Sequence, residues 1–405
     1  MHFRRQTTIC REGWYYLAIL GLVFGGAMSK EVNLLLILAG MLLGPALLNW
    51  QAVWATLRGL RLDRKLPTWV GAGDVLSVGL SLTNGRRRLG SWAVVAEERI
   101  ERETASRSGQ QRATPLQPTV LFPYVRAGQS STGNYRGRLA QRGRYRFGPV
   151  RLSTRFPFGL FSRSITVGET ETLIVLPRLG RLTQNWNARR LEAFSGTDRR
   201  RRQPGPEGDF FGVREWRPGD GRRLIHWRSS ARLGKLVVRQ LERPRSRDVA
   251  IVLDLWQPES PTAKQLDTVE RTVSFAATVL TDLCRKGGSN VYLGFDQSAA
   301  GAADAAPADC LGGSASPAIL QGMMERLALA EAHNGDGLAV VLAAVLRRIA
   351  PETELVLVST RPVDVSDLSS RFADARSGPM LRELLRRARV IDASSGQLDE
   401  YFETQ

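Results

Sequence analysis

Two uncharged, apolar stretches lie near the N-terminus: WYYLAILGLVFGGAMS at residues 14–29 and VNLLLILAGMLLGPALLNW at residues 32–50. A helix that spans a membrane needs about 20 such residues, within a range of about 17–25. The second stretch meets this length, whereas the first is marginal unless its flanks contribute. We therefore predict two transmembrane helices, at about residues 14–30 and 32–50, in a membrane anchor formed by residues 1–58.

Basic residues predict the orientation of this anchor. The outer flanks of the two stretches carry Arg4, Arg5, Arg11, Arg58, Arg61, Arg64 and Lys65. The turn between the stretches carries only Lys30, beside Glu31. Because cytoplasmic flanks of membrane helices are enriched in Lys and Arg, both outer ends and the bulk of the chain are expected in the cytoplasm.

Two other interpretations of the apolar region remain open. A cleaved signal peptide has a basic start, an apolar middle and small residues at its end, as residues 4–29 do. Against it, the region has no good A-x-A cleavage site, and a second apolar stretch follows at once. A soluble pair of helices is the other alternative, but the second stretch has no polar face for water.

The overall charge of the 405-residue chain is +18, from 57 Lys and Arg against 39 Asp and Glu. Such an excess suits an anionic partner: nucleic acid, an acidic membrane surface or an acidic protein. The three cysteines have no paired spacing, which fits a reducing compartment. The three histidines are too dispersed to indicate a zinc site.

Residues 59–180 are predicted to form a β-rich, sandwich-like domain. VLSVGLSLTN at residues 75–84 alternates apolar and polar side chains, which is typical of a half-buried strand. WAVVAEERI, PTVLFPYV, GNYRGRLA, RGRYRFGPVRLSTRF and ETLIVLP are further strand-like runs bounded by Gly and Pro. FPFGLF at residues 156–161 is expected to be an apolar turn that closes one end of the domain.

Residues 181–247 form an arginine-rich segment. Between positions 199 and 247 there are 14 Arg and one Lys against five acidic residues. One interpretation is structural, because guanidinium groups stack on aromatic rings and pair with carboxylates. In that case Arg214, Glu215, Trp216, Asp220, Arg222 and Trp227 hold one another in a fixed loop. The other interpretation is a basic surface for phosphate or an acidic protein. No nucleic-acid module accompanies the segment, so nucleic acid is the less favoured partner.

Residues 248–405 alternate strand and helix patterns. Buried strands are predicted at residues 248–256, 290–295, 354–360 and 389–394, and helices at 263–285, 317–332, 337–349 and 381–387. Residues 299–317 are expected to form a loose loop. Such alternation predicts an α/β domain with a mainly parallel sheet covered on both faces.

GDFFGVREWRPGDGRRLIHWRSSARLGKLVVRQLE, at residues 208–242, resembles the signature of the domain of unknown function 58 family. The matching positions are Gly208, Phe210, Arg214, Trp216, Gly219, Asp220, Arg223, Ile225, Trp227, Ala231, Arg232, Leu236 and Arg239. The resemblance implies a bacterial inner-membrane protein whose C-terminal domain is similar to von Willebrand factor type A domains. It also implies a partner, a MoxR-type AAA+ ATPase, in the assembly or maturation of envelope components.

Many type A domains bind a divalent cation through D-x-S-x-S after the first strand, where oxygen ligands suit a hard cation. In this sequence Asp254 remains, but Trp256 and Pro258 replace the two serines. Asp254 is therefore the only candidate metal ligand at that position, which argues against a metal site, and no cofactor is expected.

The sequence favours a non-catalytic, membrane-anchored interaction protein. It contains no P-loop, no metal-ligand cluster and no nucleophile–base pair, and Ser229 with His226 lacks a partnered acid at a defined spacing. A binder of anionic lipid or nucleic acid through the arginine-rich segment is the alternative. A cryptic hydrolase that uses Asp254, Asp220 or His226 is a third hypothesis.

Overall fold

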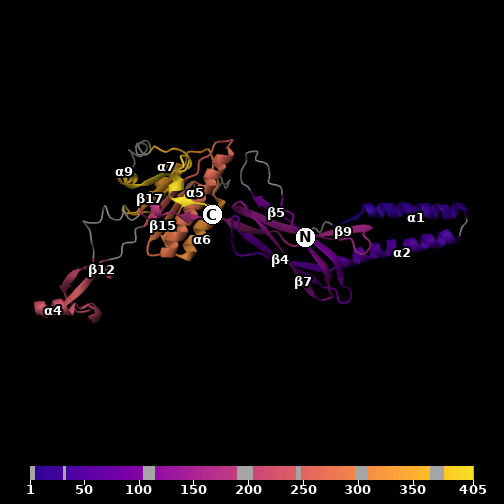
Figure 1. The fold of residues 1–405 in the computed structure, drawn as a ribbon, viewed down its shortest axis with the longest axis horizontal. Coiled ribbons are helices and arrows are strands. Elements are labelled where there is room, and N and C mark those ends of the chain that lie inside the picture. Colours follow the sequence, from indigo (N-terminus) through magenta and orange to yellow (C-terminus); the bar gives the residue numbers. More distant parts are fainter. Residues whose placement is uncertain are drawn as a thin grey trace. The chain divides into compact units, whose positions relative to one another are not determined.

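The structure is a computed structural model, and it describes residues 5–30, 33–103, 115–188, 204–242, 248–296, 309–364 and 378–404. The chain divides into two compact units, Met1–Arg178 and Leu179–Gln405, here called the N-terminal and C-terminal units. The N-terminal unit combines the predicted anchor with the β-rich segment. The C-terminal unit contains the arginine-rich hairpin and the α/β sheet (Figure 1).

Two helices, α1 (Arg11–Lys30) and α2 (Asn33–Thr56), lie side by side in the N-terminal unit (Figure 1). Among the described helices, only α2 is long and apolar enough to cross a membrane. Helix α1 is less apolar because it includes Arg11, Glu12 and four glycines. Large apolar side chains of both helices are exposed, for example Leu22, Leu34 and Met41. An exposed apolar surface of this kind indicates contact with a membrane or another protein.

The predicted strand runs of the N-terminal unit are confirmed as strands of two mainly antiparallel sheets. The larger sheet contains, in spatial order, β1 (Arg5–Ile9), β9 (Phe161–Val167), β8 (Gly143–Thr154), β10 (Glu171–Leu176) and β3 (Val70–Gly71), with β5 (Ser91–Glu103) beside β8 and β6 (Thr119–Val125) beside β5. The smaller sheet contains β2 (Leu60–Lys65), β4 (Val75–Asn84) and β7 (Ser130–Arg138).

The two sheets share one hydrophobic core. Strand β4 alternates as its sequence predicts, with Leu76 and Val78 among its buried side chains. Phe122, Phe147 and Leu152 of the larger sheet belong to the same buried cluster. Side chains of a strand point alternately to its two faces, so every second residue of β4 reaches this core.

Strands β1 and β2, which flank the helix pair, were not predicted as strands; their basic residues were interpreted as the flanks of membrane helices. Strand β1 pairs antiparallel with β9, and β2 pairs antiparallel with β4. Both are sheet elements because a long-range neighbour supplies their hydrogen bonds, a signal that local sequence does not carry. Arg64 of β2 is buried inside the unit instead of lying on an open basic flank.

The apolar turn at residues 156–161 joins the β-sheets to α2. Leu160 and Phe161 form a buried cluster with Ala46 and Val53 of α2, whereas Phe158 is exposed. The predicted apolar turn is therefore present, and its buried side chains, Leu160 and Phe161, pack against α2. Helix and sheets are thus packed together within one compact unit.

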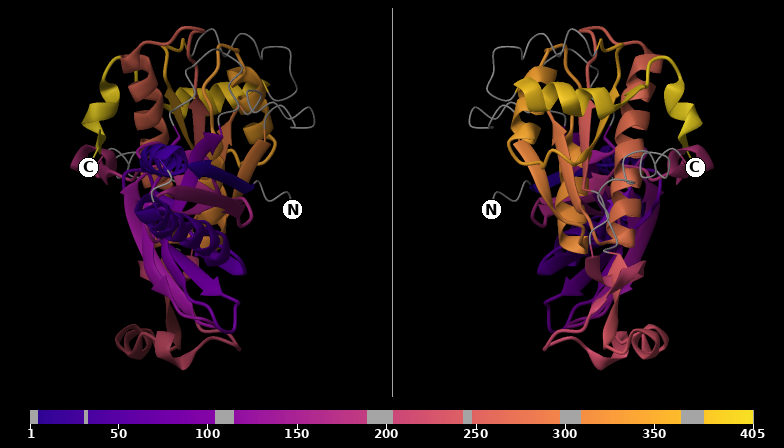
Figure 2. Two further views of the ribbon diagram at one scale, coloured as in Figure 1. Left: turned by 90° about the vertical axis from the view of Figure 1, so that its right-hand side faces the viewer. Right: turned by 90° about the vertical axis from the view of Figure 1, so that its left-hand side faces the viewer.

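The C-terminal unit is built on a five-stranded sheet in the order β16-β15-β14-β17-β18. The four predicted strands are present and run parallel, as β15 (Asn290–Phe295), β14 (Val249–Asp254), β17 (Glu354–Ser359) and β18 (Arg389–Asp392). The helices of this unit are α5 (Ala263–Lys286), α6 (Pro317–Leu329), α7 (Leu338–Leu346) and α9 (Gly378–Arg387). They lie on both sides of the sheet (Figure 2).

The fifth strand, β16 (Asp309–Ser314), lies within residues 299–317, which were predicted to be a loose loop, so the prediction was wrong for this part. It pairs antiparallel with β15 and makes the sheet mixed. Its sequence, DCLGGS, has little strand character. Gly312 lies against the ring of Tyr292, where any side chain would clash. The glycines that favour a loop therefore allow close packing at this sheet edge.

Residues 181–188, in the segment predicted as linker, pack within the C-terminal unit. Strand β11 (Arg181–Leu182) pairs with β19 (Phe402–Glu403), which follows the short 3-10 helix η4 (Gln397–Glu400). Trp186 is buried, and its ring lies 5.3 Å from that of Phe275 on α5. The aromatic contact with Phe275 thus holds the first part of the arginine-rich segment against α5. Residues 189–203 lie outside the described residues.

Candidate interaction surface and the Asp254 site

The arginine-rich segment folds as a β-hairpin whose connection carries short helical elements. Strand β12 (Pro204–Glu215) pairs antiparallel with β13 (Val237–Glu242), and between them lie η2 (Arg222–Leu224) and α4 (Trp227–Leu233). The pairing shifts register between Gly205 and Phe210. Gly208 and Phe210 of the signature therefore lie at this irregularity, where only their backbone is described.

A tight loop follows β12 and is closed by an arginine–aspartate pair. The guanidinium of Arg214 donates from Nη1 to Asp220 Oδ2 at 2.7 Å and from Nη2 to Oδ1 at 2.6 Å. The backbone N–H of Arg217 donates to Asp220 Oδ2 at 2.8 Å, and the indole N–H of Trp216 donates to the Asp220 carbonyl at 3.4 Å. Gly219 has a φ of +103°, which only glycine adopts readily. These signature residues determine the shape of the loop.

The helix α4 is held by its own ends and by one buried serine. His226 is its N-cap, with Nδ1 accepting from the Ser229 backbone N–H at 3.2 Å, and Gly234 ends it in the left-handed region. The buried Ser230 hydroxyl donates to the His226 carbonyl and accepts from the Val237 N–H at 3.0 Å. The bond to His226 Nδ1 satisfies a backbone N–H that the start of a helix leaves without an intrahelical partner. The Ser230 bonds fix α4 against β13.

Of the other signature side chains that the structure describes, Ile225 is buried and the rest are exposed. We call Arg222, Arg223, Trp227, Arg228, Arg232 and Leu236 the presented set; all six are exposed. Trp227 is 67% exposed, which is unusual for so large an aromatic side chain. Exposed Arg and Trp are residues that dominate binding energy at protein interfaces. The signature therefore divides into residues that shape the hairpin and residues that are available to a partner.

Charges in the hairpin act locally. The hydrogen bond from Arg214 holds the pKa of Asp220 below its ordinary value, and the hydrogen bond from Lys235 does the same for the pKa of Glu215. Both carboxylates are therefore ionised at neutral pH and neutralise one basic side chain each.

The structure brings only part of the predicted lock together. Arg214 and Trp216 both contact Asp220, but Glu215 pairs with Lys235, and Arg222 and Trp227 are exposed. Ala231 and Arg239 of the signature are exposed as well. The hydrolase hypothesis gains no support from His226, because its Nδ1 caps α4 and accepts from the Ser229 backbone instead of from a hydroxyl.

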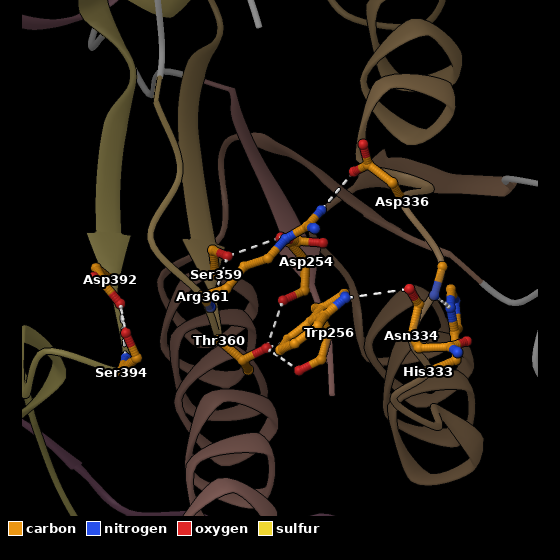
Figure 3. A network of polar contacts seen from close by, with 11 residues as sticks. Asp254, Trp256, His333, Asn334, Asp336, Ser359, Thr360, Arg361, Asp392 and Ser394 are labelled. Atoms are coloured by element: carbon orange, nitrogen blue, oxygen red, sulfur yellow. Dashed lines mark hydrogen bonds and ion pairs between the residues drawn. The ribbon is translucent and has the colours of Figure 1, made fainter. Parts of the chain in front are cut away.

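Asp254 lies at the carboxyl end of β14, where the neighbouring β17 also ends. Its buried Oδ2 accepts from the Ser359 hydroxyl at 2.8 Å and from Arg361 Nε at 2.9 Å. Arg361 also donates from Nη2 to Asp336 Oδ1 at 2.5 Å, so the guanidinium bridges two carboxylates (Figure 3). The two strands are thus tied together at the edge of the sheet where parallel α/β folds bind ligands.

A second layer of contacts surrounds this bridge (Figure 3). Thr360 accepts from the Trp256 N–H at 2.9 Å and donates to the Trp256 carbonyl at 2.6 Å. The Trp256 indole donates to the Asn334 carbonyl at 3.2 Å. His333 Nε2 lies 3.2 Å from Asp296 Oδ2, beside a small hollow lined by Asp254. Trp256 is thus held in place by hydrogen bonds to Thr360 and to the Asn334 backbone.

The residues around Asp254 do not fit a divalent-cation site of the type A kind. The positions that would supply hydroxyl ligands hold Trp256 and Pro258, and the positive charge facing Asp254 is the guanidinium of Arg361. Within the described ranges, no group of three or more His, Cys, Asp or Glu side chains could hold a metal ion. A cation at Asp254 would have to displace Arg361.

Sequence reasoning missed Arg361, Ser359 and Asp336 as partners of Asp254. A signal was available in the sequence: the buried strand β17 ends at Ser359, and Thr360 and Arg361 follow it directly. Polar residues at the carboxyl end of one parallel strand meet those of its neighbour. These residues can be assigned to Asp254 only when it is known that β17 lies beside β14 in the sheet.

Comparisons with known proteins agree with the signature. The sequence model of the family described as "Protein of unknown function DUF58" matches residues 212–306. The chain is similar to the uncharacterized protein YeaD of Bacillus subtilis (strain 168), with 26% identity over 237 residues. This match covers 57% of the chain and 54% of YeaD, so the chain spans about half the length of that relative.

Two solved structures with which the chain was matched are distantly similar to it. The CARDB domain of PF1109 from Pyrococcus furiosus matches with 13% identity, over 29% of this chain and 92% of that one, at a TM-score of 0.19. Spo0M, a sporulation control protein from Bacillus subtilis, matches with 9% identity, over 34% of this chain and 55% of that one, at a TM-score of 0.18. At these scores they assign no fold. The signature at residues 208–242 and the family model that matches residues 212–306 support the DUF58 family of unknown function for this chain.

Proposed function

We propose that this protein is a membrane-anchored adaptor without catalytic activity, whose hairpin binds a MoxR-type AAA+ ATPase during assembly or maturation of envelope components. The observation that carries the proposal is the presented set. Its arginines and Trp227 are exposed on a hairpin held by Arg214 and Asp220. A rigid aromatic anchor surrounded by guanidinium groups suits an acidic protein surface with an apolar pocket.

The proposed anchor consists of two membrane crossings, α1 and α2, in the inner membrane of a bacterium. Support for a paired crossing comes from the strands on its outer ends. Strand β1 precedes α1 and β2 follows α2, and both pair with strands that share one hydrophobic core. Two ends held in one folded unit lie on the same side of a membrane. The basic outer flanks support a cytoplasmic location for that side.

We further propose that the N-terminal sheets form a sandwich-like domain and that the C-terminal unit has a von Willebrand factor type A-like fold. Two sheets around one core support the first assignment. A parallel core of β15, β14, β17 and β18 with helices on both sides supports the second. The sheet edge at Asp254 would then be a second docking surface, whose resident cation is Arg361.

The adaptor proposal is tested by binding between the purified full chain in detergent and the AAA+ ATPase encoded nearest to it. We expect Arg223→Gln/Arg232→Gln, and separately Trp227→Ala, to weaken association at least tenfold. The matched control, Arg285→Gln/Arg386→Gln, removes two exposed charges from α5 and α9 and should bind like the unaltered chain. Equal binding by all variants, or no binding by the unaltered chain, would contradict the proposal.

The alternative is a binder of anionic lipid or nucleic acid, favoured by the same exposed arginines. It predicts binding of the hairpin to DNA or anionic vesicles with a steep loss of affinity as salt rises. ATPase binding that survives physiological salt, with no retention of DNA under the same conditions, separates the adaptor from this alternative.

A further inference from the structure

The carboxyl end of α2 is bordered by two hollows within the N-terminal unit. The larger has a volume of about 650 Å³ and lies between the end of α2, β2 and β9. The smaller has about 370 Å³ and is lined by Trp50, Trp54 and Arg86. Arg58, two residues beyond the end of α2, lines both. The two hollows therefore meet at one arginine.

Charge in the larger hollow is entirely positive. Arg58, Arg61 and Arg163 line it, and none of its described lining residues is acidic. Its remaining surface is largely apolar, with Leu57, Leu60, Ile165 and Val167. Guanidinium groups bind phosphate oxygens through paired hydrogen bonds. Three arginines beside an apolar wall suit a ligand that joins a phosphate to a hydrocarbon chain.

Trp54 contacts two of these arginines. The guanidinium carbon of Arg163 lies 3.6 Å from the Trp54 ring centroid, and that of Arg58 lies 6.0 Å from it. Such distances are those of cation–π contacts. Arg163 is only 3% exposed and is fixed by its surroundings, whereas Arg58 and Arg61 are exposed and able to turn toward a ligand. The hollow thus combines one fixed arginine with two adaptable ones.

The helix end beside the hollow is already capped by another residue. Arg86 donates to the carbonyls of Ala55 and Thr56 in the last turn of α2 and to Gly90 and Ser91. A cation at this end also suits the helix dipole. Burial lowers the pKa of Arg86, which is consistent with an enclosed structural role. Arg58 and Arg61 are therefore not needed as caps.

The depth of the hollow matches the surface of a bilayer. Helix α2 has 24 residues, so its length at 1.5 Å per residue is about 36 Å, against about 30 Å for the hydrocarbon core. Trp50 and Trp54 lie in its last two turns, as aromatic residues do at membrane interfaces. If α2 spans the membrane as proposed, its last turn and the hollow lie at headgroup level on the cytoplasmic face.

We infer that this hollow binds the headgroup of an anionic phospholipid. Arg58, Arg61 and Arg163 would receive the phosphate, while Ile165 and Val167 would contact the glycerol and the first acyl carbons. Basic pockets beside membrane helices on the cytoplasmic side are suited to such headgroups. The inference rests on the proposed anchoring of α2, and it adds a specific lipid to it.

The experiment uses the full chain purified in a non-ionic detergent and titrated with phosphatidylglycerol, with Trp fluorescence and thermal unfolding as readouts. We expect Arg58→Gln/Arg61→Gln to weaken phosphatidylglycerol binding at least tenfold. The control Arg136→Gln/Arg138→Gln removes the same charge from exposed positions on β7, near the end of the sheet that pairs with Val75. It should bind like the unaltered chain. Circular dichroism checks that both variants fold, since all four arginines are exposed.

Three outcomes would overturn the inference: equal effects of phosphatidylglycerol and phosphatidylcholine, equal loss in both double variants, or an equal response to inorganic phosphate at the same concentration. The last would indicate a free-phosphate site. Flotation with vesicles tests the anchor separately. A chain that floats but does not prefer phosphatidylglycerol keeps its anchor and loses the headgroup site, whereas a chain that does not float loses both.

Discussion

Two arginine–carboxylate pairs, one in the N-terminal unit and one on the hairpin, show how burial changes the role of the same chemistry. Arg64 and Glu98 have side chains 3% and 0% exposed, whereas Arg214 and Asp220 are 34% and 18% exposed. Glu98 accepts from Arg64 Nε and from the Tyr135 hydroxyl, both at 2.5 Å. The first pair joins strands of the two sheets, and the second closes a loop of seven residues that presents other side chains.

The Arg361–Asp254 pair lies between these extremes, with side chains 26% and 6% exposed. Its two residues are 107 positions apart in the sequence, whereas those of the hairpin pair are only 6 positions apart. A buried pair is required for a stable fold, because removing one partner leaves an unpaired charge in the interior. An exposed pair remains hydrated when broken and mainly determines local shape.

The largest effect is expected from Glu98→Ala. Removing this carboxylate leaves the buried Arg64 with only Glu171, which accepts at 2.8 Å, as its acidic partner. We expect the free energy of unfolding to fall by about 3–5 kcal/mol, measured by denaturant unfolding of the full chain in detergent. Glu101→Ala, which removes a partly exposed partner of Arg99 and Arg146, is the control and should cost about 0–1 kcal/mol. Equal costs would break the comparison.

A smaller loss is expected from Asp254→Ala. The variant removes the acceptor of Ser359 and one of the two carboxylates on Arg361, but Asp336 remains and the guanidinium reaches solvent. We expect the free energy of unfolding to fall by about 2–4 kcal/mol, below the effect of Glu98→Ala.

A double-mutant cycle sharpens this prediction. Asp254→Ala/Arg361→Met should cost less than the sum of the two single changes, because removing both charges leaves neither without a partner. Strict additivity would show that Asp254 and Arg361 do not stabilise each other. Ser359→Ala, expected to cost about 1 kcal/mol, separates the hydroxyl from the charge.

Asp220→Ala should leave the thermal midpoint of the full chain unchanged while altering the hairpin. Without Asp220 the loop loses its bonds from Arg214 and from the Arg217 backbone. We expect binding of the proposed ATPase to weaken about tenfold, measured by titration with the purified partner. Gly219→Ala should act in the same direction, since its φ of +103° disfavours any side chain. A lowered thermal midpoint with unchanged ATPase binding would mean that this exposed pair stabilises the fold and does not shape the binding surface.

The smallest effect is a pH dependence of the hairpin. The folded pKa of Asp220 is depressed by Arg214, so the pair's contribution is complete above the ordinary aspartate pKa of about 3.9 and is lost as pH falls through the folded value. Between pH 5 and 8 the indole signal of Trp216, followed by NMR, should not change with pH. It should shift only in acid, and Asp220→Asn should abolish that shift. A midpoint above pH 5 would contradict the pairing.

Local patterns in the sequence predicted much of the fold. Alternation placed a strand at residues 75–84, which is confirmed as β4. The helix predicted from residue 263 is α5, and its start has a reciprocal cap in which Thr262 and Gln265 bond each other's backbone. Strands β1, β2 and β16 escaped prediction because pairing with distant neighbours, rather than their own residues, makes them strands.

The candidate sites follow the same division. The sequence alone determined the apolar helix α2, the excess of arginine and the signature, including contacts such as Arg214 with Asp220, because short separations leave few possible partners. Only the tertiary structure decided that Arg361 faces Asp254, that Arg64 is buried, and that Arg58, Arg61 and Arg163 line one hollow. The physical reason is that strand order and burial, which sequence spacing does not encode, decide which distant charges meet and how strongly water screens them.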